Sequence, residues 1–331
     1  MRPATLLTGL AAKNMNNECG KRSFGLSACR LVLVALLTIA GGCATRPSPV
    51  SVDQGYVSNT WTTTVPCRID DGLFWTQAKI NGRTVPCVID TGSTLPFWPR
   101  SMRLRGETAD QVWSRLHVRV PSEASVTFRD RVQSCEYRLL TQIYVGQFRL
   151  TNVPTLCVDD SHVPFQSPAF ALGSVALSQT SVTFDARART VVFAHGYDDI
   201  SRSIRPPTSQ IWTIDWLRGA PVIRARIAGH PALLLVDTGS TFSMVSRRFA
   251  DKYLPKANGP VAHVSAQVAS AVTTPTIEVP VCIGVNQIDS MVVPIAGWPA
   301  QTDGSLGAAF LAHGRFTLDY PHGKALYEPY N

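Results

Sequence analysis

The sequence predicts an all-β protein built from two copies of one β-rich unit. A block at residues 72–94 recurs at residues 219–241, which indicates an internal duplication. Most of the chain consists of short apolar segments that are typical of β-strands. Helical periodicity is sparse, and its best candidates are residues 106–116 and 243–254.

The composition favours folded domains with buried cores. Of the 331 residues, 45% are hydrophobic and 16% are charged, which excludes a disordered protein. Glycine and proline follow no period, so collagen-like and low-complexity classes are excluded as well. At roughly 100–200 residues per domain, the length suits two domains or one large one.

Residues 1–42 are predicted to be a secretion signal. An uncharged apolar run at residues 31–40 follows Lys21, Arg22 and Arg30. The run is shorter than the roughly 20 residues of a membrane-spanning helix, and it has the length of the apolar core of a signal peptide.

The signal ends at a cysteine. Residues 40–43 (AGGC) resemble a bacterial lipobox, although the family usually has Leu where this chain has Ala40. The resemblance implies that Cys43 carries a lipid and holds the protein in the bacterial cell envelope, facing the periplasm, with the outer membrane as the expected membrane. The alternative is an ordinary cleaved signal that leaves Cys43 as a free thiol. Translation starts at Met1 or at Met15, and a signal that begins at Met15 has the more usual length.

Removal of the signal halves the net positive charge. The whole chain has 31 Lys and Arg against 23 Asp and Glu, a net charge of +8. Residues 1–42 hold five of the basic and one of the acidic side chains, so 26 and 22 remain, a net charge of +4. The remaining basic clusters, such as Arg247-Arg248, are short and typical of a solvated face. No nucleic-acid partner is expected.

Each copy of the repeat predicts a β-hairpin that ends in an aspartate. Residues 72–94 read GLFWTQAKINGRTVPCVIDTGST and residues 219–241 read GAPVIRARIAGHPALLLVDTGST, at a constant offset of 147. In both copies an alternating strand leads through a glycine-containing turn to a second apolar strand. The two hairpins therefore deliver Asp90 and Asp237 at strand ends.

A second pair of blocks gives the outline of the domains. Residues 170–193 match residues 304–327 at an offset of 134, so the first copy holds thirteen extra residues, which are expected within 100–136. Both blocks contain a hydrophobic-glycine pair, Leu172-Gly173 and Leu306-Gly307. The expected organisation is a signal peptide at 1–42, a lipid-anchored tether at 43–66, a first lobe at 67–197, a proline-containing linker at 198–211 and a second lobe at 212–331.

Five cysteines remain in the expected lobes: Cys67, Cys87, Cys135, Cys157 and Cys282. Because five is odd, at most two disulfides form and one thiol remains, and the pairing stays open. Neither Cys-x-x-Cys nor His-Glu-x-x-His spacing occurs, so no metal or other cofactor is expected.

Asp90 and Asp237 are the candidate catalytic residues. Asp90 follows VPCVI at residues 85–89, and Asp237 follows LLLV at residues 233–236. A carboxyl group at the end of such a run enters apolar surroundings, which raise its pKa. If the hairpins face each other about a local two-fold axis, the two carboxyls share one proton. The ionised one then serves as general base on a water, and the protonated one donates to a carbonyl oxygen under attack.

The residues after each aspartate are expected to support its carboxyl group. Backbone amides and serine hydroxyls can donate to a carboxylate, glycine permits close approach, and threonine can bond across to its counterpart. If the serine hydroxyls stabilise the charged form, their removal is expected to move a pH optimum upward. The residues concerned are Thr91, Gly92 and Ser93 in the first copy and Thr238, Gly239 and Ser240 in the second.

These strings resemble the motifs of the aspartic peptidases. Two hydrophobic-Asp-Thr-Gly-Ser strings, each followed by a hydrophobic-Gly pair, are similar to the clan that holds pepsin-like and retropepsin-like enzymes, over roughly residues 68–330. Each copy is closer in length to a retropepsin unit than to a pepsin lobe. The resemblance implies two retropepsin-like β-barrel lobes related by a pseudo-two-fold axis, an active cleft between them, and a hairpin flap. Neither 117–136 nor 258–275 carries a flap signature.

The resemblance implies a single-chain aspartic endopeptidase that acts on proteins or peptides. Both aspartates lie in one chain, so the active site does not require oligomerisation. The alternative is a catalytically silent peptide-binding or assembly lipoprotein of the same fold. The motifs do not indicate which peptide bonds are cleaved.

Overall fold

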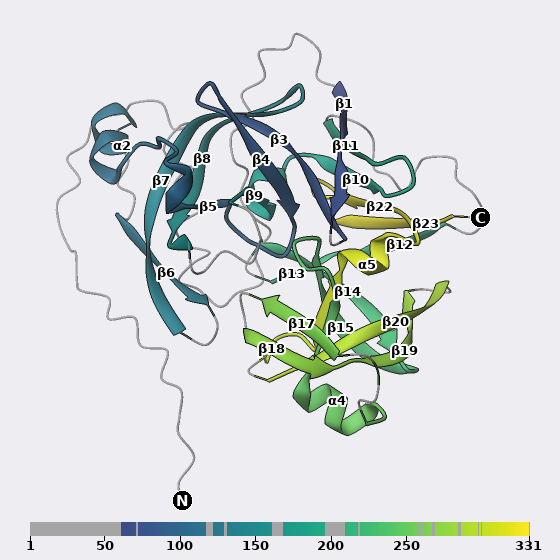
Figure 1. The fold of residues 1–331 in the computed structure, drawn as a ribbon. Helices are drawn as coiled ribbons and strands as arrows, with labels where there is room; N and C mark the ends of the chain where they lie inside the picture. Colours follow the sequence, from purple (N-terminus) through teal and green to yellow (C-terminus); the bar gives the residue numbers. More distant parts are fainter. Residues whose placement is uncertain are drawn as a thin grey trace, which may run out of the picture.

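The computed structural model is mostly β-sheet, which confirms the predicted all-β class (Figure 1). It describes residues 61–70, 72–116, 122–128, 131–160, 168–195, 209–217, 219–256, 259, 261–266, 269–283, 286–296, 298 and 300–330. The predicted signal, Cys43, most of the predicted tether and most of the predicted linker lie outside these residues. Within them, no helix is both long enough and apolar enough to cross a membrane.

The first copy of the repeat forms an eight-stranded sheet, which we call the first sheet. Its strand order is β2-β3-β4-β9-β5-β8-β7-β6, and β3 also pairs with β7, so the sheet closes on itself. Along β3 the side chains alternate, with Ala78 and Ile80 buried and Lys79 exposed. The strands are β2 Arg68–Asp70, β3 Leu73–Ile80, β4 Arg83–Asp90, β5 Phe97–Pro99, β6 Glu123–Phe128, β7 Arg131–Val145, β8 Phe148–Val158 and β9 Phe170–Gly173.

The second copy forms a seven-stranded sheet with the same arrangement, which we call the second sheet. Its order is β13-β14-β15-β21-β16-β20-β19, and β14 also pairs with β19. Strand for strand this repeats the order of the first sheet, except for β6. The strands are β13 Asp215–Leu217, β14 Ala220–Ile227, β15 His230–Asp237, β16 Ser243–Ser246, β19 Ile277–Ile283, β20 Asn286–Ile295 and β21 Gly304–Gly307. A separate hairpin consists of β17 Val261–Ala266 and β18 Ala269–Pro275.

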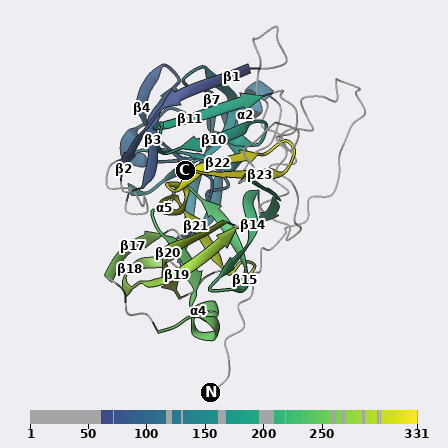
Figure 2. The same cartoon turned by 90° about the vertical axis from the view of Figure 1, so that its right-hand side faces the viewer.

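A six-stranded sheet joins the two copies, in the order β1-β11-β10-β22-β23-β12. At its centre β10 pairs antiparallel with β22, and Thr183 lies opposite Thr317 with the two hydroxyl oxygens 2.8 Å apart. Figure 2 shows β22 and β23 between the blue strands of the first sheet and the green strands of the second. The strands are β1 Trp61–Pro66, β10 Ser181–Asp185, β11 Thr190–His195, β12 Gln210–Thr213, β22 Gly314–Asp319 and β23 Lys324–Pro329.

Two predicted boundaries fall within strands of this sheet. The predicted tether, 43–66, includes β1, which pairs with β11 along its whole length. Thr63 and Val65 of β1 are buried while their neighbours are exposed or partly exposed, so the segment is a strand of the folded body. The predicted linker ends at residue 211, whereas β12 begins at Gln210 and pairs with β23.

The helices are short: α2 Ala109–Leu116, α3 Ser174–Leu177, α4 Arg247–Tyr253, α5 Ala308–Leu311 and the 3-10 helix η1 Arg100–Met102. The helix expected over 243–254 is shorter than predicted. Its first four residues form β16, which is buried and pairs with β20 and β21. Ser246 then caps α4, because its hydroxyl accepts a hydrogen bond from Phe249 N.

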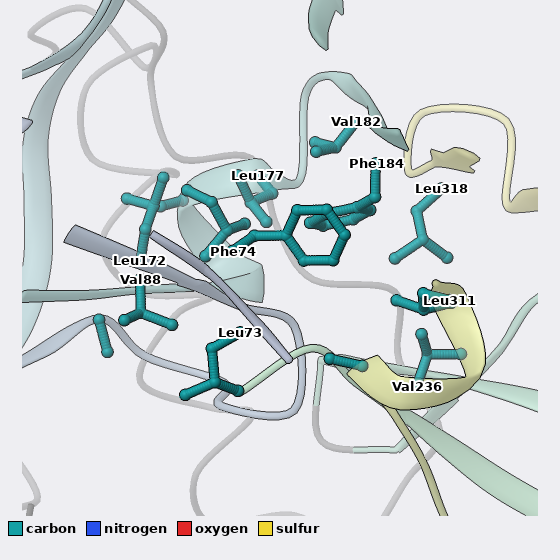
Figure 3. Close-up of a cluster of buried hydrophobic side chains, with 14 of the residues drawn as sticks. Leu73, Phe74, Val88, Leu172, Leu177, Val182, Phe184, Val236, Leu311 and Leu318 are labelled. Carbon is teal, nitrogen blue, oxygen red and sulfur yellow. The ribbon is translucent and has the colours of Figure 1, made fainter. Parts of the chain in front are cut away.

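A continuous core connects the first sheet with the six-stranded sheet. Figure 3 shows Phe74 of β3 beside Phe184 of β10, and their ring centroids lie 5.1 Å apart at 64°, an edge-to-face geometry that stabilises aromatic pairs. Val236 of β15 and Leu311 of α5 belong to the same buried cluster. Both copies of the repeat therefore contribute to one core beneath the ends of β4 and β15.

Candidate active site

Asp90 and Asp237 end β4 and β15, each beside a strand that carries the hydrophobic-glycine pair. Asp90 lies opposite Gly173 in a parallel pairing, and Asp237 lies opposite Gly307 in the same way. A Cβ atom on either glycine would overlap the backbone of the loop that follows the aspartate. Glycine is therefore needed because that loop crosses directly over the strand. The preceding Leu172 and Leu306 are fully buried.

The two carboxyl groups lie next to each other, each against the opposite loop. We call residues 90–94 the first loop and residues 237–241 the second loop. A Cβ atom on Gly92 would overlap Oδ1 of Asp237, and a Cβ atom on Gly239 would overlap the carboxylate of Asp90. Each glycine thus leaves the space that the other copy's aspartate occupies.

Thr91 and Thr238 bond the two loops together, as the sequence predicts. Thr91 Oγ1 donates to Val236 O (2.7 Å), and Thr238 Oγ1 donates to Ile89 O (2.6 Å). Each hydroxyl also accepts the backbone N–H of the other threonine, at 3.1 Å from Thr238 N and 3.0 Å from Thr91 N. Both threonines are fully buried, so these four bonds are shielded from water and hold the aspartates in register.

The backbone amides of the loops donate to the carboxylates unequally. Asp90 Oδ1 accepts from Gly92 N and from Ser93 N, both at 3.1 Å. Asp237 Oδ1 accepts from Gly239 N at 3.1 Å, while Ser240 N donates to the main-chain oxygen of Asp237. Asp90 is buried, with 4% of its surface exposed, and Asp237 is partly exposed.

Burial raises the pKa of both carboxyl groups. For Asp90 the raising effect of burial is opposed by the Ser93 and Gly92 amides. For Asp237 burial is joined by the negative charge of Asp90, and together they raise its pKa well above the ordinary value. The amide donors therefore favour the charged form of Asp90, the charge of Asp90 opposes ionisation of Asp237, and the two carboxyl groups titrate as a coupled pair.

The hydroxyls of Ser93 and Ser240 do not reach the carboxylates, and this part of the prediction is wrong. Ser93 Oγ donates to Leu95 O (2.7 Å), and Ser240 Oγ donates to Phe242 O (3.0 Å). A hydroxyl has one hydrogen to donate, and in both loops a turn carbonyl takes it. The support that Ser93 gives to Asp90 comes from its backbone amide.

Sequence reasoning missed a second group of polar residues beneath the first loop. Ser174, at the start of α3, donates to Thr91 O (2.6 Å) and lies 3.2 Å from the hydroxyl of Tyr320. The equivalent of Ser174 in the second copy is Ala308. A comparison of the two repeat blocks could have drawn attention to this difference between Ser174 and Ala308. The contact between Tyr320 and Ser174 is evident only from the structure.

A pocket of about 1040 Å³ lies on another part of the first sheet. Its lining comes from β1 to β4 and β7 and includes Cys67, Trp75, Lys79 and Tyr144. Neither Asp90 nor Asp237 lines it. The pocket is therefore distinct from the site formed by the two loops.

The five cysteines of the expected lobes are all free thiols. Cys67, Cys87, Cys135 and Cys157 are buried, and Cys282 is partly exposed. Across the part of the chain that the structure describes, no three His, Cys, Asp or Glu side chains are grouped so that they could hold a metal ion.

No protein-family model matches this chain, and no curated protein is significantly similar to it in sequence.

Proposed function

We propose that this protein is an aspartic endopeptidase in which Asp90 and Asp237 act together on one water molecule. The observation that carries the proposal is the placement of each carboxyl group against the glycine of the opposite loop. Two carboxyls in one buried site cannot both ionise readily. The pair therefore supplies one base and one acid at the same place, which is what water-mediated hydrolysis of an amide requires.

The unequal hydrogen bonds give each aspartate a role. Asp90, with two amide donors, takes a proton from the water as its oxygen bonds to the peptide carbonyl carbon. Asp237 gives its proton to the carbonyl oxygen. When the C–N bond breaks, the proton on Asp90 passes to the leaving nitrogen, and the hydroxyl formed from the carbonyl oxygen returns a proton to Asp237. One water is consumed and the pair regains its starting state.

The proposal includes a relation between the two halves. We regard the first and second sheets as retropepsin-like β-barrel lobes about a pseudo-two-fold axis, with a substrate cleft between them. The matching strand orders support this relation, as do the crossed threonine bonds. Because one chain contributes both aspartates, the proposed enzyme acts without oligomerisation.

The proposal also covers the location of the protein. Residues 1–42 are proposed to be a signal peptide, and Cys43 to carry a lipid that holds the enzyme on the periplasmic side of the envelope. Replacement of Cys43 by serine should then move the protein from the membrane fraction to the soluble fraction. Retention of the Cys43→Ser variant in the membrane fraction would contradict the anchor.

Cleavage of an unfolded protein by the full chain tests the proposed activity. We expect cleavage in the acidic to neutral pH range, inhibition by a statine-type peptide, and loss of cleavage in Asp90→Asn and in Asp237→Asn. Asp110→Asn is the matched control, because Asp110 is an exposed residue of α2, and it should cleave like the wild type. A well-folded protein that cleaves nothing at any pH would instead support a silent peptide-binding lipoprotein.

A further inference from the structure

The backbone beneath the two loops is the same in both copies. In each copy the first two amides of a short helix donate to two carbonyls of the loop above. The bonds are Ser174 N to Ser93 O (2.8 Å) and Val175 N to Thr94 O (2.9 Å) in the first copy, and Ala308 N to Ser240 O (2.8 Å) and Ala309 N to Thr241 O (3.0 Å) in the second. Any difference in how α3 and α5 support the loops therefore comes from their side chains.

One hydroxyl makes that difference. Ser174 Oγ donates to Thr91 O at 2.6 Å, and the serine is fully buried. Its equivalent, Ala308, has no hydroxyl, so residue 308 cannot make the corresponding bond to Thr238 O. The first loop has a side-chain donor from its helix, and the second loop does not.

Tyr320 adds a second hydroxyl behind Ser174, 3.2 Å from Ser174 Oγ. The single hydrogen of Ser174 is directed to Thr91 O, so the tyrosine is the donor in this contact. Tyr320 follows β22 and is 1% exposed, and its ring packs against Trp216 with centroids 5.5 Å apart. The equivalent residue in the first copy is Ala186, so the repeat supplies only one such tyrosine.

Hydrogen bonds connect these two hydroxyls to the carboxylate of Asp90 through one peptide group. Thr91 C=O and Gly92 N–H belong to the same planar unit, and Gly92 N donates to Asp90 Oδ1 at 3.1 Å. A hydrogen bond to the carbonyl polarises the unit and makes its N–H a stronger donor. The series of hydrogen bonds runs from Tyr320 O–H to Ser174 O–H, through the peptide group, to Asp90. We call this series of hydrogen bonds the hydroxyl relay.

We propose that Ser174 and Tyr320 are positioning residues that make Asp90, rather than Asp237, the ionised member of the pair. Two identical loops would leave the proton equally on either carboxyl, and a fixed base and acid require a difference between them. The catalytic meaning of this inference rests on the proposed function. The effect on ionisation does not, because the relay acts on Asp90 whether or not a peptide is cleaved.

Ionisable groups act on both ends of the relay. Asp237 bonds to Asp90, and the charge of Asp90 acts on Tyr320. Burial raises the pKa of Tyr320 far above its usual value. The tyrosine therefore remains a hydrogen-bond donor across the whole pH range in which the aspartates titrate.

The pH profile of peptide cleavage by the full chain tests the relay. Ser174→Ala, which copies the second loop, and Tyr320→Phe should each move the acid limb of kcat/KM upward by roughly 0.3–1 pH unit, a two- to tenfold loss on that limb. Ser178→Ala is the matched control, because Ser178 Oγ donates to Val175 O (2.9 Å) at the end of the same helix. Its acid limb should stay in place, whereas a general packing defect would lower the rate at all pH values.

Carboxyl carbon NMR of the same proteins gives a readout that needs no activity. Spectra of Asp90→Asn and Asp237→Asn assign the two signals, and the first ionisation should belong to Asp90 and move upward in both relay variants. This movement in a protein that cleaves nothing would support the relay while the peptidase proposal fails. Cleavage by the wild type with no movement of either the acid limb or the first ionisation would overturn the relay, as would assignment of the first ionisation to Asp237.

Discussion

The hydroxyls of Thr91 and Thr238 each accept a hydrogen bond from the backbone amide of the other residue, with N to Oγ1 distances of 3.1 and 3.0 Å. The two residues come from the two copies of the repeat and lie 147 positions apart in the chain. Because each hydroxyl also donates to a carbonyl of the opposite strand, removal of one side chain leaves polar backbone groups of the other copy without partners.

Replacement of Thr91 by valine should therefore cost more stability than the loss of one ordinary hydrogen bond. Val236 O and Thr238 N both lose a buried partner, at about 1–3 kcal/mol each, so we expect a loss of roughly 2–6 kcal/mol. Thr91→Ser retains the hydroxyl and is the matched control, with an expected loss below about 1.5 kcal/mol. Urea unfolding measures both, and equal losses for valine and serine would contradict the role of the hydroxyl.

Replacement of Gly92 by alanine should remove activity, because the added Cβ overlaps the carboxylate of Asp237. We expect kcat/KM to fall by at least about a hundredfold, in line with the displacement of a catalytic group by about 1 Å. Gly239→Ala should behave in the same way toward Asp90.

Gly82→Ala provides the control for these glycines. A Cβ there meets nothing within 4 Å, although φ is +88°, so the variant should lose roughly 1 kcal/mol of stability and keep its activity. Cleavage assays on Gly92→Ala, Gly239→Ala and Gly82→Ala measure these effects. An active Gly92→Ala variant would show that the glycines do not confine the two carboxyl groups.

The raised pKa values predict that stability declines as pH increases. Burial raises the pKa of Asp90 and Asp237 above the usual value of 3.8, so between about pH 4 and the raised values the folded protein binds more protons than the unfolded chain. The pair's contribution to stability is then fully present below about pH 4 and is lost as pH rises through the folded pKa values.

Asp237→Asn removes the main part of this pH dependence. At pH 7 we expect the variant to be more stable than the wild type, with a smaller difference at pH 4. Thermal unfolding of both proteins over this range measures the effect. A wild-type stability that rises steadily from pH 4 to pH 7 relative to the variant would contradict the pKa direction.

Ser93→Ala combined with Ser240→Ala should leave the pH optimum unchanged, contrary to the expectation from sequence. Their hydroxyls donate to the carbonyls of Leu95 and Phe242, so the expected effect is a loss of about 1 kcal/mol of stability for each bond. A pH profile of cleavage distinguishes an unchanged optimum from the upward shift that the sequence predicts. An upward shift would support the sequence-based interpretation.

The sequence predicts the local features of the site well. A strand that ends on Asp-Thr-Gly places Asp90, Gly92 and the crossing threonine by short-range geometry, and both copies obey the same pattern. Sequence reasoning failed where a side chain had more than one possible hydrogen-bond partner, as for Ser93 Oγ, which bonds to a turn carbonyl.

Long-range pairing accounts for the other differences. The sequence predicts Trp61–Pro66 as part of a tether, whereas its pairing with β11 makes it a strand. The contact between Ser174 and Tyr320 joins residues 146 positions apart, and no local pattern indicates it. Tertiary structure decides such contacts because the backbone pairing of β10 with β22 brings the two segments together.

The pairing of β10 with β22 is one that two separate, identical chains could make, since Thr183 meets its own equivalent, Thr317. Such self-complementary contact is how symmetric homodimers close. A homodimer, however, carries every side chain twice, and a tyrosine beneath one loop would also lie beneath the other. Fusion of the copies into a single polypeptide removes that constraint, because Tyr320 and Ala186 can be encoded independently.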